Sequence, residues 1–463
     1  MHTRKPELKE REKLLKLEED HFHDLKSARI APGKLQETFV AFANADGGEL
    51  YVGIEDKKST GERIQGFPSP EAANDAIHTL LEETKPSVEN VEIEFIDFGK
   101  KGLVLYFFIP KSPKVHYTTQ EECYVRINAR KKRLKGEQIT QLGYTKGTYN
   151  YEKQPVDQAD IADLAESGHL ASYLERIETS LPPKVFLKKQ KLTTKQGKDT
   201  HPNVGCVLMF DEEPQATLDT RCAIKIYRLR TTEKEYKREQ LDGMPRTING
   251  PIEEQIHSAI KAIATTLSGV SYHEAGKLVK LKYPADAIKE ILVNAVIHRD
   301  YSLNDDIHIK IYDNRIEIQS PGKLPGYITR ENIYDERYSR NPNIVRLLHN
   351  LPNPLNHDIG EGLNTARNEM KKAGLVEPEI HELDNALVVT IKHQRIATLE
   401  DTILQYLKSH PGGSITNKVV RELTGEDDVN KIKKAFQRLR KQGTIMPENE
   451  NASPFQFKYK LKK

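Results

Sequence analysis

Two predicted β-hairpins, far apart in the chain, constrain the fold more than any other feature of the sequence. In the first, strands 91–98 and 102–110 flank a Gly-Lys-Lys-Gly turn. In the second, strands 306–313 and 315–320 meet at an Asp-Asn turn. Glycine, asparagine and aspartate between alternating apolar runs are typical of hairpin turns. Because a chain of 463 residues exceeds one ordinary hydrophobic core, we expect about three domains, with the two hairpins in different ones.

The composition argues against several classes of protein. With 30% charged and 37% hydrophobic residues, the chain is typical of a soluble globular protein with a well-solvated surface. The formal net charge is only +3, so any contact with nucleic acid must come from local basic clusters. Cys123, Cys206 and Cys222 lie far apart without Cys-x-x-Cys spacing, which argues against a disulfide framework and a structural zinc site.

The apolar runs and the first residues bear on location. No apolar run reaches the length that spans a membrane. The opening segment MHTRKPELKEREKLLKLEED is charged where a signal peptide would be apolar. We therefore expect a cytoplasmic protein that does not contact a membrane.

The order of the predicted elements indicates an α+β multidomain protein. We expect an α+β domain at 1–145, a linker or crossing segment at 146–184, an α/β unit at 185–395 and a small unit at 396–463. The linker is predicted because the segment TKGTYNYEKQPVDQAD is strongly polar. In the next unit, apolar runs at 204–210 and 222–229 predict strands, and helices are expected around 251–267 and 284–298.

Acidic residues gather near two predicted strands of the first domain. Asp24 and Lys26 share one face of a short strand that Glu19 precedes, because side chains alternate along a strand. Glu55 and Asp56 end the next strand. If the two strands are neighbours, the acids converge, and they repel one another unless Lys26 or a metal cation compensates. Mg²⁺ or Mn²⁺ held there would activate water against a phosphodiester. The alternative is a surface ion pair between Asp24 and Lys26 beside a turn.

Longer blocks around these acids resemble a known family. The segments EDHFHDLK, FVAFANADGGELYVGIED, GERIQGF and YVRINARKK, within residues 10–135, resemble the Schlafen AlbA-like domain. In the nuclease branch of that family, two acids of the first motif and one acid after the Gly-Gly strand cleave RNA, including transfer RNA. The resemblance implies that the catalytic metal ligands are Glu19, Asp24 and Asp56, or Glu55 in a shifted register, with Lys26 beside the scissile phosphate. This chain has Asp-Leu where the family usually has Glu-Phe, and many relatives only bind nucleic acid.

A predicted helix in the second unit carries a polar face. Glu290, Asn294 and His298 recur at every fourth position of this helix, so they lie on one face. A glutamate and an asparagine stacked in this way can polarise water and hold Mg²⁺, whereas the alternative is the polar stripe of an amphipathic helix. Further along, Gly360 and Gly362 precede a helix, where free backbone N–H groups favour a phosphate. Helix capping alone is the alternative explanation for the two glycines.

These features together resemble a second family. The helix, the hairpin, a Ser-Pro-Gly turn, an Arg-Asn-Pro triplet and a Gly-Glu-Gly segment, within residues 280–393, resemble the RecG-like C-terminal ATP-binding domain of the gyrase, histidine-kinase and MutL ATPase superfamily. The resemblance implies an ATPase-like α/β sandwich that binds ATP. It implies Glu290 as the water-activating base, Asn294 as a Mg²⁺ ligand, and Gly360 and Gly362 as part of a phosphate-side lid. Ser320 and Gly322 stand where the superfamily reads adenine with Asp-x-Gly.

Two basic segments form the predicted nucleic-acid interface. The first follows a strand of the Schlafen-like region and comprises Arg126, Arg130, Lys131, Lys132 and Arg133. The second is the helix 428–442, where Lys431, Lys434, Arg438 and Lys441 accompany an apolar stripe. Three helices followed by a hairpin predict a C-terminal winged helix, in which this helix enters the major groove and its cations release counterions from phosphates. The alternative is a solvated helix in a protein-interaction module.

Three functions are consistent with these features. The first is a divalent-metal-dependent RNA endonuclease controlled by the nucleotide-binding domain, as would suit defence against phage. The second is an ATP-responsive, DNA-binding transcriptional regulator without catalytic activity. The third is a protein–protein scaffold. We expect RNA or DNA as the partner, Mg²⁺ or Mn²⁺ and ATP as cofactors, and a homo-oligomer.

Overall fold

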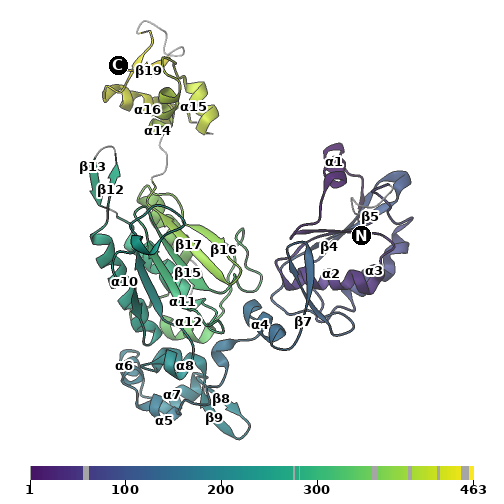
Figure 1. The fold of residues 1–463 in the computed structure, drawn as a ribbon, viewed down its shortest axis with the longest axis vertical. Helices are drawn as coiled ribbons and strands as arrows, with labels where there is room; N and C mark the ends of the chain where they lie inside the picture. Colours follow the sequence, from purple (N-terminus) through teal and green to yellow (C-terminus); the bar gives the residue numbers. More distant parts are fainter. Residues whose placement is uncertain are drawn as a thin grey trace. The chain divides into compact units, whose positions relative to one another are not determined.

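The computed structural model describes residues 2–55, 62–274, 277–280, 282–356, 362–394, 399–424, 428–449 and 458–462 (Figure 1). The chain divides into two compact units. One comprises Met1–Met370 with Glu377–Lys392, and the other comprises Lys371–Val376 with His393–Lys463. Mixed α-helices and β-sheets confirm the predicted fold class. Within the described ranges, no helix is long and apolar enough to cross a bilayer.

The N-terminal domain, residues 2–134, is built on one sheet. Its elements are β1 His2–Arg4, α1 Leu8–Lys16, β2 His23–Lys26, α2 Pro32–Asn44, β3 Gly48–Val52, α3 Asn74–Leu81, β4 Glu92–Asp97, β5 Leu103–Ile109, β6 Cys123–Ile127 and β7 Arg130–Leu134. The strand order is β1-β4-β5-β3-β2. The predicted first hairpin is confirmed as antiparallel β4 and β5. β2 runs parallel to β3, with Asp24 opposite Leu50, so the two strands that carry the predicted acids are neighbours.

Helix α2 is the centre of this domain. All residues from Leu35 to Asn44 are buried, because α2 contacts both the sheet and the separate two-stranded ribbon of β6 and β7. Apolar side chains such as Phe39 and Phe107 form the core between α2 and the sheet. On the ribbon side, Tyr124 packs against α2. Helix α2 therefore holds the ribbon in place beside the sheet (Figure 1).

The Gly-Gly pair between α2 and β3 is required by close backbone approach. Gly47 and Gly48 have φ angles of 79° and 155°, which L-residues with a side chain rarely adopt. A Cβ on Gly47 would lie 2.5 Å from Ile109 O, and one on Gly48 would lie 2.4 Å from Phe42 Cε1. Glycine here lets the chain leave α2 and enter the sheet beside β2, which sets the positions of the acids.

The segment predicted as a linker is folded. Helices α5 Ile161–Glu166 and α6 Gly168–Arg176 lie within the predicted range, and α4 Glu137–Lys146 precedes them. The elements that follow are α7 Pro183–Lys189, β8 Thr193–Gln196, β9 Asp199–Pro202, α8 Val204–Phe210 and α9 Pro214–Thr217. Asp160 and Ser167 cap α5 and α6 with their side chains, a signal that the polar composition obscured. The range predicted as a linker or crossing segment therefore contains two capped helices.

The strand predicted at 204–210 is wrong, because these residues form α8. Asn203 caps this helix, and its Oδ1 accepts a hydrogen bond from Cys206 N at 3.0 Å. Every residue of α8 is buried. A short helix buried on all sides gives a continuous apolar run, which cannot be told from a buried strand by periodicity.

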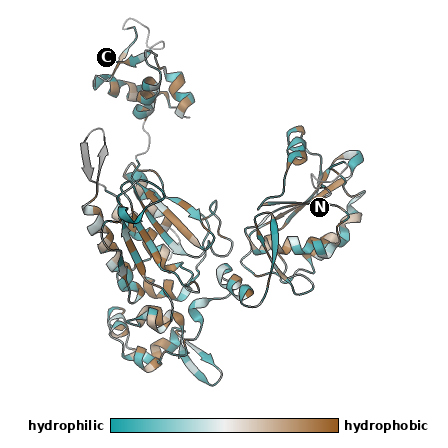
Figure 2. Ribbon diagram, viewed as in Figure 1, coloured by the Kyte–Doolittle hydropathy of each residue, from teal (hydrophilic) through white to brown (hydrophobic). Residues whose placement is uncertain are grey.

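The central domain, residues 222–392, contains the second sheet. Its elements are β10 Ile224–Arg228, β11 Arg246–Ile248, α10 Ile252–Ser268, β12 Ser271–Glu274, β13 Lys277–Lys280, α11 Ala285–Ile297, β14 Ile307–Ile311, β15 Arg315–Pro321, α12 Pro342–His349, α13 Gly362–Lys372, β16 Glu379–Glu382 and β17 Ala386–Lys392. The strand order is β11-β10-β14-β15-β17-β16, and β14 and β15 confirm the second hairpin. Helices α10 and α11 pack together and against the sheet, whose strands carry hydrophobic residues along their length (Figure 2).

The C-terminal unit has its own small core. It contains α14 Leu399–Ser409, α15 Asn417–Thr424, α16 Val429–Lys441, β18 Ile445–Pro447 and β19 Tyr459–Leu461. Strands β18 and β19 pair antiparallel. The buried apolar residues of all three helices meet in one cluster that includes Ile403, Val420 and Phe436. Three helices and a strand pair are the parts that the winged-helix prediction requires.

Candidate functional site

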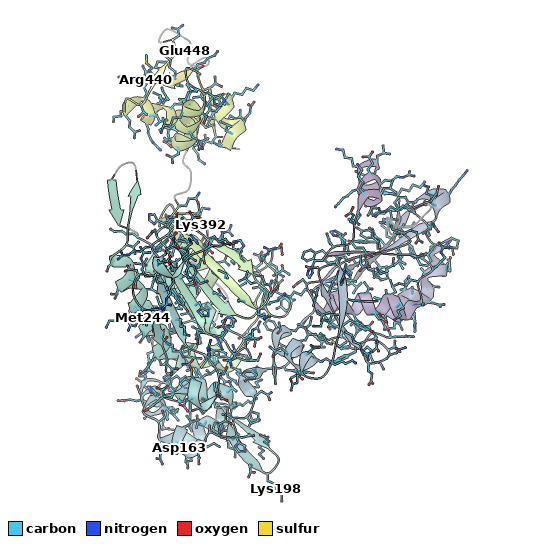
Figure 3. The ribbon with its side chains drawn as sticks, in the orientation of Figure 1. Asp163, Lys198, Met244, Lys392, Arg440 and Glu448 are labelled. Carbon is cyan, nitrogen blue, oxygen red and sulfur yellow. The ribbon has the colours of Figure 1, made fainter. Side chains whose placement is uncertain are left out.

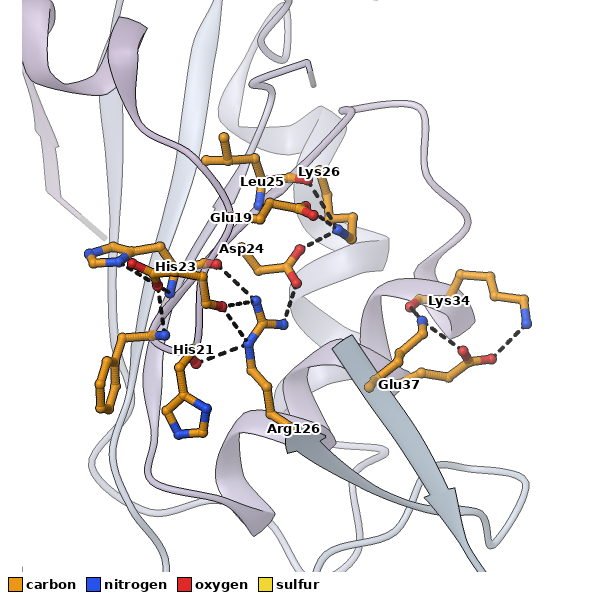
Figure 4. A network of polar contacts seen from close by, with 12 residues as sticks. Glu19, His21, His23, Asp24, Leu25, Lys26, Lys34, Glu37 and Arg126 are labelled. Carbon is orange, nitrogen blue, oxygen red and sulfur yellow. Dashed lines mark hydrogen bonds and ion pairs between the residues drawn. The ribbon is translucent and has the colours of Figure 1, made fainter. Parts of the chain in front are cut away.

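Two of the predicted acids, Glu19 and Asp24, meet at Lys26 (Figure 4). Lys26 Nζ lies 2.7 Å from Glu19 Oε1 and also contacts Asp24 Oδ1. Glu19 Oε1 accepts a further hydrogen bond from Leu25 N at 3.2 Å. Burial acts to lower the pKa of Lys26, but the Asp24 and Glu19 carboxylates outweigh it and raise that pKa. The ammonium group is therefore charged and compensates both acids.

The second oxygen of Asp24 is bound by Arg126. The side chains of Asp24 and Arg126 are 5% and 1% exposed, and Arg126 Nη1 contacts Asp24 Oδ2. The remaining guanidinium nitrogens donate to backbone carbonyl groups, including those of Asp20 and His23. The guanidinium carbon also lies 4.3 Å from the centre of the Phe42 ring. Arg126 therefore fastens β6 to the turn before β2 (Figure 4).

The prediction that Arg126 contacts nucleic acid is wrong. Side chains alternate along β6, and Arg126 is on the face of the ribbon that packs against α2. Its positive charge pairs with Asp24 inside the domain. Removal of the guanidinium group would leave the Asp24 carboxylate buried with only Lys26 to compensate its charge.

The third predicted acid does not join this cluster within the described part of the chain. Glu55 Oε1 accepts a hydrogen bond from Ser27 Oγ at 2.7 Å and lies 3.7 Å from Arg29 Nη2. Asp56 lies outside the described residues. Among those that are described, no three histidine, cysteine, aspartate or glutamate side chains are placed to hold a metal ion. The metal and catalytic roles of Glu19, Asp24, Glu55 and Asp56 stay predictions.

A cavity of about 310 Å³ lies in the central domain. Its lining includes the predicted nucleotide-binding residues Glu290, Asn294, Ser320, Gly322 and Gly362. A Cβ on Gly362 would lie 2.7 Å from Asn294 Nδ2 and 2.9 Å from Glu290 Oε2. The start of α13 thus approaches the polar face of α11 closely. Gly360 lies outside the described residues.

The end of β15 forms another part of the cavity wall. Ser320 Oγ donates a hydrogen bond of 2.6 Å to Ala295 O, so its hydroxyl group ties β15 to α11. Gly322 has a φ of +108°, and a Cβ there would lie 2.7 Å from Asp300 Cβ. Behind this glycine, Asp300 Oδ2 and Arg340 Nη1 form an ion pair of 2.7 Å between side chains that are almost fully buried. This pair packs directly against Gly322.

Two family models match the sequence. Residues 19–135 match the family described as Schlafen, AlbA_2. Residues 304–391 match the family described as putative ATP-dependent DNA helicase recG C-terminal. The chain joins a Schlafen AlbA-like domain to a RecG-like C-terminal domain. Both predicted resemblances are confirmed, and these domains indicate a nucleic-acid-related protein with a nucleotide-binding domain.

The crystal structure of the DIP2311 protein from Corynebacterium diphtheriae is 18% identical, with a TM-score of 0.40, over 96% of this chain and 92% of that chain. No curated protein matches the sequence. In the RecG-like domain, Glu290 and Asn294 precede the range that the family model matches, and the cavity brings them beside Gly362, which lies within it.

The AlbA-like domain presents cations on strand β7. All of Arg130, Lys131, Lys132 and Arg133 are exposed. Lys131 Nζ lies 2.8 Å from Glu37 Oε2, and Arg133 Nη1 lies 2.7 Å from Glu122 Oε1. Arg130 and Lys132 alternate with these two residues and so point to the other face of the ribbon, where the described part of the chain offers them no ion pair. The outward face of β7 therefore carries two cations that are available to a phosphate backbone.

Helix α16 of the C-terminal unit carries a second set of cations. The predicted residues Lys431, Lys434, Arg438 and Lys441 are all exposed. Arg438 Nη1 lies 3.0 Å from Glu400 Oε1, although its side chain remains 67% exposed. Arg440 of the same helix is also exposed (Figure 3). The buried face of α16 packs on the core of the unit, so the charged face is directed to solvent.

Sequence reasoning missed the partners that hold these sites in place. Asn44, within the Phe-Ala-Asn block, donates from Nδ2 to His116 O at 2.8 Å and to Tyr124 O at 2.9 Å. Asp300 and Arg340 were not predicted as a pair. A buried polar residue inside an apolar helix was the available signal for Asn44, because such a group requires hydrogen-bond partners.

Proposed function

We propose that this protein binds nucleic acid through the AlbA-like domain and the C-terminal unit, and that a nucleotide in the RecG-like domain controls this binding. The observation that carries the proposal is the outward face of β7. Arg130 and Lys132 are exposed there without an ion pair in the described part of the chain, whereas both oxygens of Asp24 are bound by protein cations. The protein thus acts as a nucleotide-responsive regulator, and we place it in the cytoplasm as a homo-oligomer.

The C-terminal unit supplies a second contact in this proposal. We assign it as a winged helix, with α16 as the helix that enters a groove. The exposed cations of α16 recur on one side of the helix and its apolar residues are buried, as expected for an element that lies on a phosphate backbone.

The salt dependence of binding tests the proposal. Each phosphate contact contributes about −0.7 to −0.9 to the slope of log affinity against log salt. Arg130→Ala/Lys132→Ala should therefore reduce the slope of the full chain by about 1.4 to 1.8 for labelled transfer RNA or duplex DNA. The control is Lys188→Ala/Lys189→Ala, which removes the same charge from exposed positions of α7. Equal slopes for both double variants would contradict the assignment of β7.

Nucleotide control is tested at Asn294. A non-hydrolysable ATP analogue should change the affinity of the wild type for nucleic acid and should leave that of Asn294→Ala unchanged, because Asn294 lines the cavity beside Gly362. When bound, the nucleotide would bring its phosphates, with Mg²⁺, to this polar end. The same response in both proteins would remove the cavity from the proposal.

A metal-dependent RNA endonuclease acting in phage defence is the second candidate. The observation that favours it is the meeting of Glu19, Asp24 and Lys26 at the end of β2, since a lysine beside two acids suits cleavage of a phosphodiester. Purified protein with transfer RNA and Mn²⁺ should yield fragments that Glu19→Ala/Asp24→Ala does not produce. Equal amounts of fragments from both proteins would remove this candidate.

A further inference from the structure

Three residues that line the cavity in the RecG-like domain carry buried polar atoms without partners. Among the described residues, His298 Nδ1, Ser339 Oγ and Asn356 Oδ1 make no hydrogen bond, although all three are buried from solvent. All three residues line the same cavity. A polar atom that is buried and unpaired lowers stability, so folded proteins retain few of them and a cluster calls for an explanation.

These residues are gathered by an ordered framework. Asn341 Nδ2 donates to Ile297 O and to Arg299 O, both at 2.9 Å. The segment that contains Ser339 is therefore fixed against the end of α11 where His298 lies. Asn356 Nδ2 donates to Val345 O at 3.3 Å, which fixes Asn356 to α12, the helix that follows Asn341. Hydrogen bonds thus connect the segments that carry Ser339, His298 and Asn356 through Asn341 and α12.

The cavity has a second polar end at a suitable separation. Glu290 and Asn294 approach Gly362 at the predicted phosphate end. His298 lies eight positions beyond Glu290 on the same helix, which corresponds to about 12 Å along its axis. A ligand with phosphates at one end and a heterocyclic ring at the other would extend along α11 and reach both groups.

The chemistry of the three atoms restricts the ring. Because Asn356 Nδ2 already donates to a carbonyl group, its Oδ1 is an acceptor that requires a donor on the ligand. Burial, together with Arg340, lowers the pKa of His298 to about 4, so the imidazole is neutral and one ring nitrogen accepts. The Ser339 hydroxyl group can donate to a ring nitrogen.

We propose that His298, Ser339 and Asn356 read the edge of a purine base that bears an exocyclic amino group. In the wider ATPase superfamily the carboxylate of an Asp-x-Gly motif recognises the base, and this chain has Ser-Pro-Gly in place of that motif. The three residues would supply the recognition instead. This inference rests on the proposed nucleotide-binding role of the cavity and adds the residues that select the base.

Calorimetry with the full chain tests the inference with two nucleotides. ATP and purine riboside triphosphate differ only in the amino group of the base. The wild type should bind the purine analogue at least about tenfold more weakly, because buried acceptors are then left unpaired. Ser339→Ala should weaken ATP binding about tenfold and leave the weak binding of inorganic tripolyphosphate unchanged. Ser268→Ala, on the exposed end of α10, serves as the control and should bind ATP as the wild type does.

The possible results distinguish failure of base recognition from failure of nucleotide control. If ATP and purine riboside triphosphate bind equally, water alone fills this end of the cavity, and base recognition is refuted while nucleotide control stands. If Ser339→Ala binds ATP as tightly as the wild type, base recognition by this residue is refuted too. If the wild type binds neither nucleotide, nucleotide control and base recognition both fail. The comparison of the two nucleotides uses only the wild type, so it does not depend on the folding of a variant.

Discussion

Replacing Asp24 by asparagine separates a structural role from a metal-binding role by the sign of its effect on stability. Asp24 is 5% exposed, and its two oxygens contact Lys26 and Arg126. Asparagine keeps the shape of the side chain but removes the charge, so Arg126 loses its ion pair while Lys26 keeps only the one with Glu19. The buried Arg126 is the more affected of the two because its side chain is only 1% exposed.

The expected cost is a loss of about 3–5 kcal/mol, the range for breaking a buried ion pair by removal of one partner. Arg126 keeps its backbone acceptors in the turn before β2, which places the estimate at about 3 kcal/mol, the lower end of that range. A metal site predicts the opposite sign. Without the ion, converging carboxylates repel one another, so removal of one acid would stabilise the metal-free protein.

Amide hydrogen exchange of the full chain provides the assay, because it reports local stability in a protein of several domains. Peptides from β2 and α2 should lose protection in Asp24→Asn. Asp75→Asn is the control, since Asp75 is exposed on α3 and its replacement should cost less than about 1 kcal/mol. Unchanged or increased protection of β2 and α2 in Asp24→Asn would refute the structural role.

Three further predictions concern single side chains. Gly362→Ala should abolish calorimetric binding of an ATP analogue, because the added Cβ would lie 2.7 Å from Asn294 Nδ2. Burial lowers the pKa of His116 to about 4, below the unfolded value of about 6.5, so the stability of the wild type should fall by about 3 kcal/mol as pH drops through this window. The stability of His116→Gln, measured by denaturation, should not show this fall over the same pH range. Burial also lowers the pKa of Lys146 to about 7, so thermal stability should rise from pH 7 toward pH 10 in the wild type but not in Lys146→Met.

Much of the sheet framework was predictable from local pattern. The two hairpins and helices α10, α11 and α16 follow alternation or helical periodicity, and the structure places them close to the predicted bounds. The errors at α5, α6 and α8 have two causes. Helix α8 is buried on all sides, so its sequence lacks the amphipathic repeat by which longer helices are recognised. Helices α5 and α6 bury only two and three residues each, within a polar segment that resembles a linker.

The site was predictable as a set of residues but not as a set of contacts. A shared site for Glu290, Asn294 and Gly362 could be predicted, because the helical spacing and the glycine are visible in the sequence. The structure places all three residues in the cavity wall. The pairing of Arg126 with Asp24 could not be predicted, because a run of basic residues does not show which side chain points into the domain. That choice depends on the register of β6 against β7 and on the position of Asp24 in a distant strand.

Mapping the bound nucleic acid by amide exchange tests the central claim most directly. The full chain would be compared with and without saturating transfer RNA, and with and without duplex DNA. The account predicts increased protection of β7 and α16 with at least one of the two ligands, and no change in helices α5 to α7. Protection that is absent from both β7 and α16, while binding is saturated, would contradict it.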